Sequence, residues 1–441
     1  MPTHYAVFVS AVVGSFRKRS AALASLIAAL LSTPRPSSVV EISLAPSFER
    51  KFASVYDALT DGQIDEASLR QILREFMPTD VLRIGGYRVV VVDCTPIPRP
   101  NSPTLAERGW QRVDDRAVPG IKLSAVVSPM SDQGGSWVVP IDIRRVRVEM
   151  TANQVAVEQV REVVAASKDE KIVFVVDGGY EGKAFLAEFV GKGPRIAVAV
   201  RLRGNRVLYE PTPPKSGRRG RPRVHGDRFP LHSPGKPDRV ETMVSDKGAN
   251  LVLSAWLDKR LMQPSDLPGV VVRVEAVDDD GKPRFKRPIW LFWTGDPSTR
   301  LHDIANAYFA RFAVEHFFRF AKGSLGLEAP KTIDVKALDN WHWIVLLAYW
   351  SLLLNRDKLR SCRPWDPKLR RESPIPTPGQ SLMAWPAIYP TFGEQPPPPK
   401  PRGKSPGRRI GFTPTHKPHT PVAKSPRSCG NKPENTPTIA A

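Results

Sequence analysis

One stretch of the chain combines acidic, basic and phenolic side chains at helical spacing. Residues 304–327 have an apolar pattern typical of a helix. On such a helix one face carries a phenol, three cations and a carboxylate, namely Tyr308, Arg311, Glu315, Arg319 and Lys322. This face suits a polyanion with a metal ion at its centre. The same spacing also fits a solvated face in which Glu315 pairs with Arg319.

Two further carboxylates follow sequences typical of buried strands. Residues 87–92 read YRVVVV before Asp93, and residues 171–176 read KIVFVV before Asp177. If the two strands are neighbours, their ends lie about 4.8 Å apart and the carboxylates can share divalent ions. A strand-final Asp is also common for turn reasons alone, since its side chain bonds the backbone two residues on.

Three carboxylates of this kind predict metal-assisted phosphoryl transfer. Mg²⁺ prefers oxygen ligands, which Asp and Glu supply. Two such ions about 3.5–4 Å apart hold the attacking and the leaving oxygen of an in-line displacement. The cations near Glu315 would then hold DNA phosphates on either side of the scissile one.

The surrounding pattern predicts an α/β core between a helical module and a tail. Helices are expected at residues 20–31, 48–59, 65–76 and 335–360, and a further helix of about 17 residues begins at a Thr151 cap. Further strands are expected at residues 121–127, 137–148 and 196–200. The resulting division is a helical N-terminal module with possible DNA binding (1–80), a first core part (81–202), a β-rich insertion with a basic loop (203–295), a second core part (296–361) and a Pro-rich, basic, disordered tail (362–441).

The motif Y-x2-R-x3-E-x6-K is matched at every spacing by Tyr308, Arg311, Glu315 and Lys322. With the two preceding Asp residues, the chain resembles the transposases of bacterial insertion sequences that carry a D-D-E triad on an RNase H-like core. The resemblance covers roughly residues 80–355. It implies an α/β fold, with an RNase H-like mixed sheet and flanking helices interrupted by a β-rich insertion.

The resemblance also implies roles for individual residues. Asp93, Asp177 and Glu315 would be the catalytic ligands of two Mg²⁺ ions, for which Mn²⁺ can substitute. Tyr308, Arg311 and Lys322 would contact DNA at the element end. Arg319 lies on the same face but outside the motif, so its DNA contact is expected from geometry alone.

The activity implied is that of a DNA transposase. Phosphodiesters would be cut at each element end, and the resulting 3′-hydroxyl would attack target DNA. The expected partner is double-stranded DNA, both the terminal inverted repeats and the target, bound by a homodimer in the cytoplasm, in association with the nucleoid. Two alternatives stay open: a metal-dependent nuclease on the same core that cuts without joining, and a non-catalytic DNA-binding protein derived from a transposase.

A basic segment with a Gly-Arg-Pro core lies in the predicted insertion. Its arginines at positions 219, 221 and 223 (Arg219, Arg221 and Arg223) could enter a narrow minor groove, where the potential is most negative. A solvated basic loop is the alternative. His225 and His232 lie nearby without a cysteine partner, which argues against zinc.

Composition limits the class of protein. Lys and Arg number 65 against 44 Asp and Glu, a net charge of +21 that favours nucleic acid or an anionic membrane as partner. The three cysteines lack C-x-x-C spacing, which argues against structural zinc and disulfides. No apolar run reaches 18 residues and no basic amphipathic helix has an aromatic face for lipid, so we expect no membrane partner.

Overall fold

The structure is a computed structural model, and it describes most of the chain. The described residues are 3–51, 53–131, 137–167, 169–214, 223–245, 248–278, 282–284, 287–359, 375–388, 407, 410–413 and 417–424.

Strands and helices have the following bounds. The strands are β1 (Phe16–Lys18), β2 (Gln63–Ile64), β3 (Arg83–Ile84), β4 (Tyr87–Pro98), β5 (Gly109–Val113), β6 (Arg116–Pro129), β7 (Val138–Val146), β8 (Ile172–Val176), β9 (Ile196–Leu202), β10 (Val207–Tyr209), β11 (Arg228–Pro230), β12 (Arg239–Val244), β13 (Asn250–Arg260), β14 (Pro268–Val277) and β15 (Ile289–Trp293). The α-helices are α1 (His4–Gly14), α2 (Ser20–Leu31), α3 (Val39–Ser43), α4 (Ala53–Asp61), α5 (Glu66–Glu75), α6 (Ala152–Ala166), α7 (Lys183–Leu186), α8 (Leu301–Phe309), α9 (Phe312–Gly323), α10 (Val335–Leu354), α11 (Arg356–Leu359) and α12 (Pro378–Ile388), and the 3₁₀ turns are η1 (Gly178–Tyr180) and η2 (Ala187–Phe189).

Thirteen strands of the described residues form one mixed sheet. Its centre is the order β7-β6-β4-β8-β9, in which β4, β6 and β7 pair antiparallel while β8 and β9 run parallel to β4. Helix α6 connects β7 to β8, and α7 connects β8 to β9. The predicted fold class, an RNase H-like mixed sheet with flanking helices, is confirmed.

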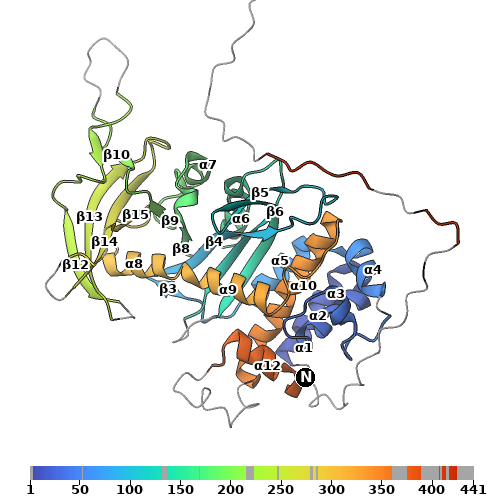
Figure 1. Cartoon of the computed structure of the whole chain (residues 1–441). Coiled ribbons are helices and arrows are strands. Elements are labelled where there is room, and N and C mark those ends of the chain that lie inside the picture. The colour runs from blue at the N-terminus through green and yellow to red at the C-terminus, as the bar shows by residue number, and fades with distance from the viewer. Residues whose placement is uncertain are drawn as a thin grey trace, which may run out of the picture.

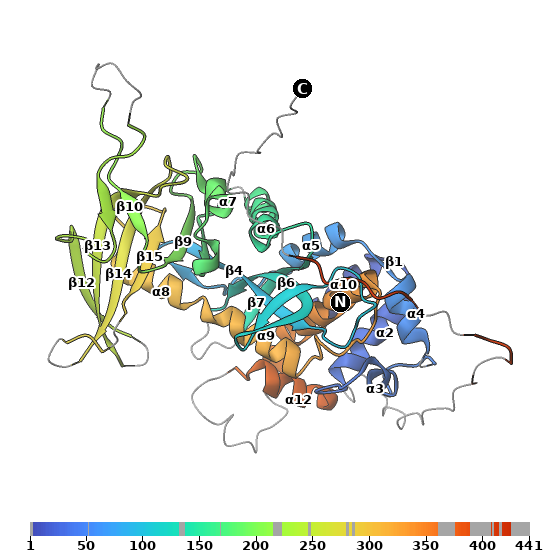
Figure 2. The same cartoon turned by 45° about the horizontal axis from the view of Figure 1, so that its top comes forward.

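The β-rich stretch after β9 extends this same sheet. Strand β15 pairs antiparallel with β9, and β14, β13 and β12 follow outward from it. Figures 1 and 2 show these strands reaching away from the helical end of the molecule. The β-rich stretch is therefore joined to the core sheet by the backbone hydrogen bonds between β15 and β9.

Helices cover both faces of the sheet (Figure 1). Alternate residues along each central strand point to opposite faces because the strand repeat is two residues. Val89 and Val91 of β4 belong to the cluster that includes α8, α9, α10 and the N-terminal helices. Val90 and Val92 belong to the cluster formed with α6 and α7. The β4 sequence lacks polar alternation because both of its faces are buried.

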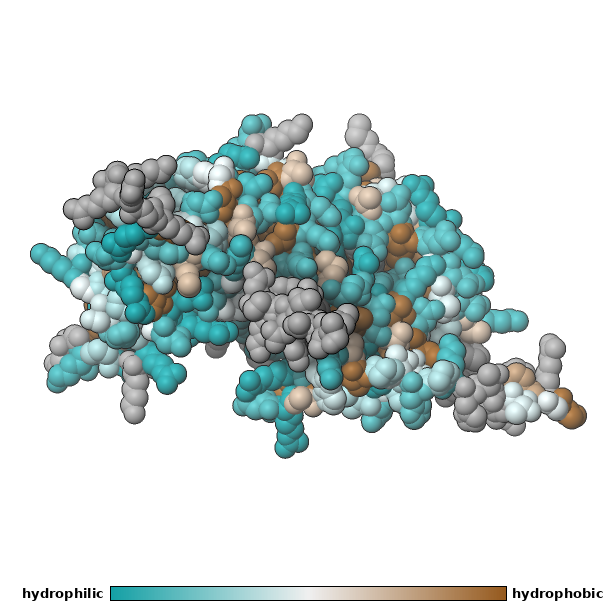
Figure 3. Space-filling view, turned by 90° about the horizontal axis from the view of Figure 1, so that it is seen from above, coloured by the Kyte–Doolittle hydropathy of each residue, from teal (hydrophilic) through white to brown (hydrophobic). Residues whose placement is uncertain are grey.

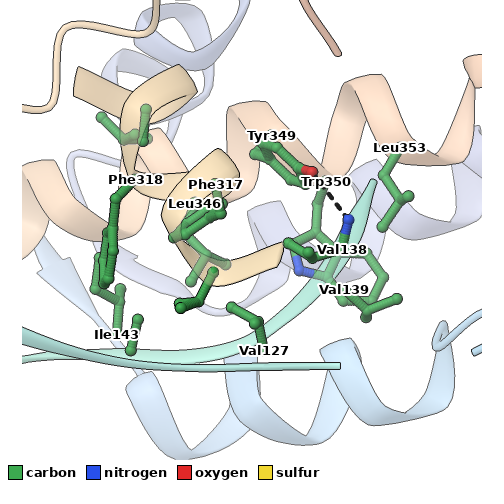
Figure 4. Packing of buried hydrophobic residues seen from close by; sticks show 14 of the residues in the cluster. Val127, Val138, Val139, Ile143, Phe317, Phe318, Leu346, Tyr349, Trp350 and Leu353 are labelled. Atoms are coloured by element: carbon green, nitrogen blue, oxygen red, sulfur yellow. Dashed lines mark hydrogen bonds between the residues drawn. The ribbon is translucent and has the colours of Figure 1, made fainter. Parts of the chain in front are cut away.

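Helix α9 is held on the sheet by its apolar face. The buried residues Val314, Phe317, Phe318 and Ala321 follow an i, i+3, i+4, i+7 pattern. Figure 4 shows Phe317 and Phe318 among Val127, Ile143 and Leu346, beside Tyr349 of α10. The hydroxyl of Tyr349 accepts a hydrogen bond from the Val138 amide at 3.2 Å, which fastens α10 to β7.

Two N-terminal helices agree closely with the predicted ones, whereas α4 begins five residues later than the predicted helix 48–59 and α1 and α3 were not predicted. Helix α2 has the predicted bounds, and α5 begins after an Asp65 cap whose side chain accepts from the Ser68 amide at 3.0 Å. The Thr151 cap of α6 forms a capping box with Gln154. Asn340 of α10 donates to the carbonyls of Leu59 and Gly62, so the N-terminal module is anchored to the core.

Two predictions are wrong. Residues 304–327 do not form one helix, because a tight turn separates α8 from α9. Part of the predicted disordered tail is ordered: α12 buries Leu382 and Trp385, and the Trp137 indole donates to the Pro376 carbonyl at 2.6 Å. The high proline content of this segment favoured the prediction of disorder, although the segment also contains apolar residues that pack against α10. The remainder of the tail lies mainly outside the described residues.

The surface is polar where Figure 3 displays it. Hydrophilic residues predominate on that face, and apolar ones are scattered over it. In the described parts of the chain, no helix has both the length and the apolar character required to cross a bilayer.

His342 is a buried titratable group in α10. Its side chain is 2% exposed, and neither ring nitrogen has a hydrogen-bond partner among the described residues. Burial, followed by the nearby cations of Arg145 and Arg99, lowers its pKa to about 3. The Asp339 carboxylate lies 4.0 Å from the His342 Nδ1. The folded protein therefore holds this imidazole neutral.

We expect the His342 environment to destabilise the protein in acid. The folded-state pKa of His342 lies below the unfolded value of 6.5. The contribution of the neutral imidazole to the free energy of unfolding is therefore complete above about pH 6.5 and is lost as the pH falls toward 3. In this window the wild type should lose about 1.4 kcal/mol of unfolding free energy per pH unit relative to His342→Leu. Urea unfolding at several pH values measures this. Parallel pH curves for the two proteins would contradict the prediction, and the exposed His316→Gln is the control.

Candidate active site

Asp93 and Asp177 lie level with one another just beyond the paired part of two adjacent parallel strands. The predicted end of the first strand at residue 92 is wrong, because β4 continues past Asp93 to Pro98, whereas Asp177 directly follows β8. Val91 of β4 pairs with Val175 of β8, and Asp93 and Asp177 each lie two residues beyond this pair. Both continue the alternation of the residues whose side chains face α8 and α9. The two strands are neighbours, which meets the condition set out from the sequence, and both carboxylates lie on the same face of the sheet.

The glutamate reaches the same place from α9. One guanidinium, that of Arg311, donates from Nη1 to Asp93 Oδ2 at 3.1 Å and from Nη2 to Glu315 Oε1 at 2.9 Å. The Asp93 and Glu315 carboxylates are therefore no farther apart than a single guanidinium spans. Arg311 is 9% exposed, whereas the Glu315 side chain is 43% exposed and borders solvent.

The other two acids lie near enough to Asp93 to affect its ionisation. Burial, followed by repulsion from the Asp177 and Glu315 carboxylates, raises the pKa of the Asp93 carboxyl to about 6. The Cys94 amide, donating to Asp93 Oδ1 at 2.8 Å, and the Arg311 cation oppose the rise. The structure thus brings together Asp93, Asp177 and Glu315, which are far apart in the sequence.

Asp177 is fixed by the turn that follows β8. Its Oδ1 accepts a hydrogen bond from the Gly179 amide at 2.8 Å, as the N-cap of η1. A Cβ atom on residue 179 would lie 3.0 Å from this oxygen, so glycine leaves room for the close contact. The turn holds one carboxylate oxygen and leaves the other available.

The turn between α8 and α9 changes where the motif residues point. Around it the backbone bonds span three residues, with the Arg311 amide bonded to the Tyr308 carbonyl and the Val314 amide to that of Arg311. Three-residue bonds wind the chain more tightly than the helix assumed from sequence. Tyr308 is 3% exposed, because it continues the buried stripe of Leu301, Ile304 and Ala305 on α8. Its DNA contact stays a prediction.

Of the two remaining predicted cations on α9, only Lys322 has a contact with β4 among the described residues. Lys322 donates from Nζ to the Pro96 carbonyl at 2.7 Å and pairs with Glu328 at 3.2 Å. Arg319 is exposed. Two residues lie between Asp93 and Pro96 along β4, so Lys322 is a near neighbour of the acidic cluster formed by Asp93, Asp177 and Glu315.

The cations predicted elsewhere are only partly described. Arg223 is exposed and pairs with Asp227 at 3.0 Å, while Arg219 and Arg221 lie outside the described residues. In the N-terminal module Arg17 pairs with Asp65 and Arg19 pairs with Asp61. None of the contacts recorded for the described residues joins Arg223, Arg17 or Arg19 to the acidic cluster.

Two features beneath the site were not recognised in the sequence. The Tyr180 hydroxyl contacts Cys94 Sγ at 3.2 Å, and burial raises the pKa of both groups. These side chains lie on the α6 and α7 side of the sheet and support the two strand ends from behind. The inward-pointing side chain of Arg311 was also not predicted, although the i, i+4 spacing of Arg311 and Glu315 is apparent in the sequence.

The donor set fits divalent ions of the Mg²⁺ type. Three carboxylates crowded together favour a cation between them, and carboxylate oxygens are the ligands such ions take. Within the described ranges no group of three or more His, Cys, Asp or Glu is close enough to hold a metal ion as the side chains now lie. The Arg311 guanidinium fills the space between Asp93 and Glu315 instead.

We expect Asp93→Asn to stabilise the metal-free protein at neutral pH. The folded-state pKa of about 6 lies above the unfolded value of 3.8, so the Asp93 carboxyl favours folding below about pH 4 and loses this contribution as the pH rises through 6. Relative to wild type, the variant should gain roughly 2–3 kcal/mol between pH 4 and pH 8. Urea unfolding in EDTA measures this, with the exposed Asp57→Asn as control. A difference in unfolding free energy between Asp93→Asn and wild type that does not vary with pH would refute the prediction.

Comparison with known proteins places the chain in a family. A search of curated proteins finds no match. Among solved structures, a piggyBac transposase synaptic complex with hairpin DNA is 12% identical, with a TM-score of 0.38 over 89% of this chain and 72% of that chain. The NurA nuclease from Sulfolobus solfataricus is 9% identical, with a TM-score of 0.25 over 71% of this chain and 95% of that chain. At these values neither likeness bears on the chemistry.

The sequence itself matches a family model. That model describes the DDE superfamily endonucleases and matches residues 11–258, which include both aspartates and more than half of the chain. The chain belongs to the DDE superfamily endonuclease family.

Proposed function

We propose that this protein is the transposase of an insertion sequence. It cuts phosphodiesters at the element ends in a metal-dependent reaction and joins the 3′-hydroxyl to target DNA. The observation that carries the proposal is the meeting of Asp93 and Asp177, level on parallel strands, with Glu315 on the helix that crosses them. Membership of an endonuclease family supports the hydrolytic half of this activity.

The roles proposed for the acids follow from their positions. Asp93 and Asp177 hold two Mg²⁺ ions, or Mn²⁺ in their place, from the rigid sheet, and Glu315 completes the ligand set from the solvent side. The bound ions supply activation of the attacking hydroxyl and neutralise charge on the leaving oxygen. The sheet fixes the two aspartates, and the packed α9 fixes the glutamate.

The proposed DNA path runs along the exposed side of α9. Arg319 and Lys322 lie one and two turns beyond Glu315, at the spacing of cations that hold neighbouring phosphates. Arg223 and the basic loop before it, with Arg219 and Arg221, would contact the duplex farther out. The net charge of +21 supports a long phosphate-binding surface.

The wider assembly is proposed on the resemblance to insertion-sequence transposases. Both element ends must be held together for joining, which calls for a homodimer on the terminal repeats and the target, acting in the cytoplasm at the nucleoid. We keep the division into a helical module (1–80), two core parts (81–202 and 296–361) and an insertion (203–295). The helical module is a candidate for end recognition.

Isosteric removal of each acid tests the catalytic proposal. Asp93→Asn, Asp177→Asn and Glu315→Gln should each reduce cleavage of DNA carrying the element ends by more than about a hundredfold, the loss seen on changing residues that merely support metal ligands. DNA affinity should stay within a few-fold of wild type. Cleavage and joining are measured on gels with Mg²⁺ or Mn²⁺, with Asp57→Asn as control.

The outcomes separate the proposed transposase from its alternatives. Joined products in wild type that vanish in all three variants support the transposase. Cleavage without joining would indicate a nuclease on the same core. DNA binding without any metal-dependent cleavage would indicate a non-catalytic DNA-binding protein.

Removal of one cation tests the DNA path. Arg319→Ala should weaken duplex binding and reduce the slope of log affinity against log salt by about 1, because one phosphate contact is lost. Fluorescence anisotropy at several salt concentrations measures this. Arg161→Ala, which removes a cation of α6 that is paired with Glu188 of η2, should leave the slope unchanged. Equal slopes for wild type and Arg319→Ala would show that Arg319 does not contact a DNA phosphate.

A further inference from the structure

We propose that Arg311 is a gate for the metal site, which closes the acidic cluster in the free protein and opens when a DNA phosphate takes the guanidinium. The proposal rests on the proposed function for the identity of the ligands. It adds a role for Arg311 before DNA is bound, together with an order in which the site assembles.

The closed state is defined by two charge-assisted hydrogen bonds. Arg311 Nη1 lies 3.1 Å from Asp93 Oδ2, and Nη2 lies 2.9 Å from Glu315 Oε1. The other oxygen of Asp93 accepts from the Cys94 amide. Both oxygens of Asp93 are therefore occupied without a metal ion.

The guanidinium and a divalent ion compete for the same oxygens. An ion of the Mg²⁺ type needs carboxylate oxygens at about 2.0–2.1 Å and near-octahedral geometry. A guanidinium between Asp93 and Glu315 blocks this approach and repels a second cation. This accounts for carboxylates that converge electrostatically yet do not form a metal-binding group among the described residues.

Arg311 is held in a way that permits release. Its Nε is buried and lacks a hydrogen-bond partner in the described part of the chain, so the closed position leaves one donor unsatisfied. It stands in the turn between α8 and α9, at the first helical residues of α9, and Glu315 opens to solvent beside it. A phosphate accepts two parallel bonds from a guanidinium, as the carboxylates do now.

Coupling between DNA and metal follows from this exchange. A phosphate that takes Arg311 frees Asp93 and Glu315, so DNA raises the affinity for metal ions. By linkage, metal ions raise the affinity for DNA by the same factor. The free protein would then carry an incomplete site, and the site would be completed on its substrate.

The test measures Mn²⁺ binding rather than activity. Metal-free wild type, Arg311→Gln and Arg161→Gln are titrated with Mn²⁺ alone, with free Mn²⁺ followed by electron paramagnetic resonance. Arg161 on α6 is the matched control because it is also an arginine paired with a carboxylate, that of Glu188 in η2. We expect Arg311→Gln to bind Mn²⁺ about tenfold more tightly than wild type and Arg161→Gln, within the usual range of coupling between sites.

A second titration adds a short duplex of arbitrary sequence, with Mn²⁺ bound by the duplex alone subtracted. Wild type should gain about tenfold in Mn²⁺ affinity, and Arg311→Gln should gain little because its gate is already open. Equal Mn²⁺ affinities of wild type and Arg311→Gln without DNA would overturn the gate. A wild type that gains nothing from DNA would overturn the release by phosphate.

Two safeguards keep these results interpretable. Circular dichroism checks that Arg311→Gln is folded, and Arg311→Lys, whose single ammonium does not span both carboxylates in a planar fork, should bind Mn²⁺ with intermediate affinity. If neither variant folds, the wild-type titrations with and without DNA decide the matter. A protein that shows the gate but cuts no DNA contradicts the proposed function and leaves this inference standing.

Discussion

The parallel pairing of β4 with β8 is the constraint on which the acidic cluster depends. Because Val91 pairs with Val175, the two aspartates leave the sheet at the same level and on the same face. A shift of one residue would send one of the carboxylates to the α6 side. Both strands are buried on both faces, so such a shift would also misplace every valine in them. The hydrophobic core therefore sets the geometry of the polar site.

The third carboxylate is positioned by packing rather than by pairing. Phe317 and Phe318 lie two and three residues after Glu315, and their burial against β6 and β7 fixes the rotation of α9. Truncation of a buried aromatic side chain to alanine typically removes about 3–5 kcal/mol of stability. Here it would also release the helix that carries Glu315 and Arg311. The apolar side chains of Phe317 and Phe318 thus hold Glu315 in place over the strands.

Much of this arrangement could be predicted from the sequence, and the failures have physical causes. The β-branched runs before Asp93 and Asp177 predicted two buried strands. Helices α2 and α5 agreed with the prediction because apolar periodicity and, in α5, the Asp65 cap are local signals. The turn before Arg311 escaped detection because its residues keep helical backbone angles and contain neither Pro nor Gly. The inward position of Arg311 depends on Asp93, 218 residues away. Helix α12 was not predicted because the Pro-rich composition of the tail favoured disorder, despite the few apolar residues of this helix.

The continuity of the sheet from β9 through β15 to β12 has a consequence for how this chain tolerates change. An appendage joined by loops alone can be lost while its host survives. Here, deleting residues 203–293 would remove the antiparallel neighbour of β9 and leave a row of unpaired amides and carbonyls one strand away from β8, which precedes Asp177. Such a bare edge invites association with other chains. Internal deletions of the gene in this region should therefore yield aggregated protein rather than a smaller working enzyme.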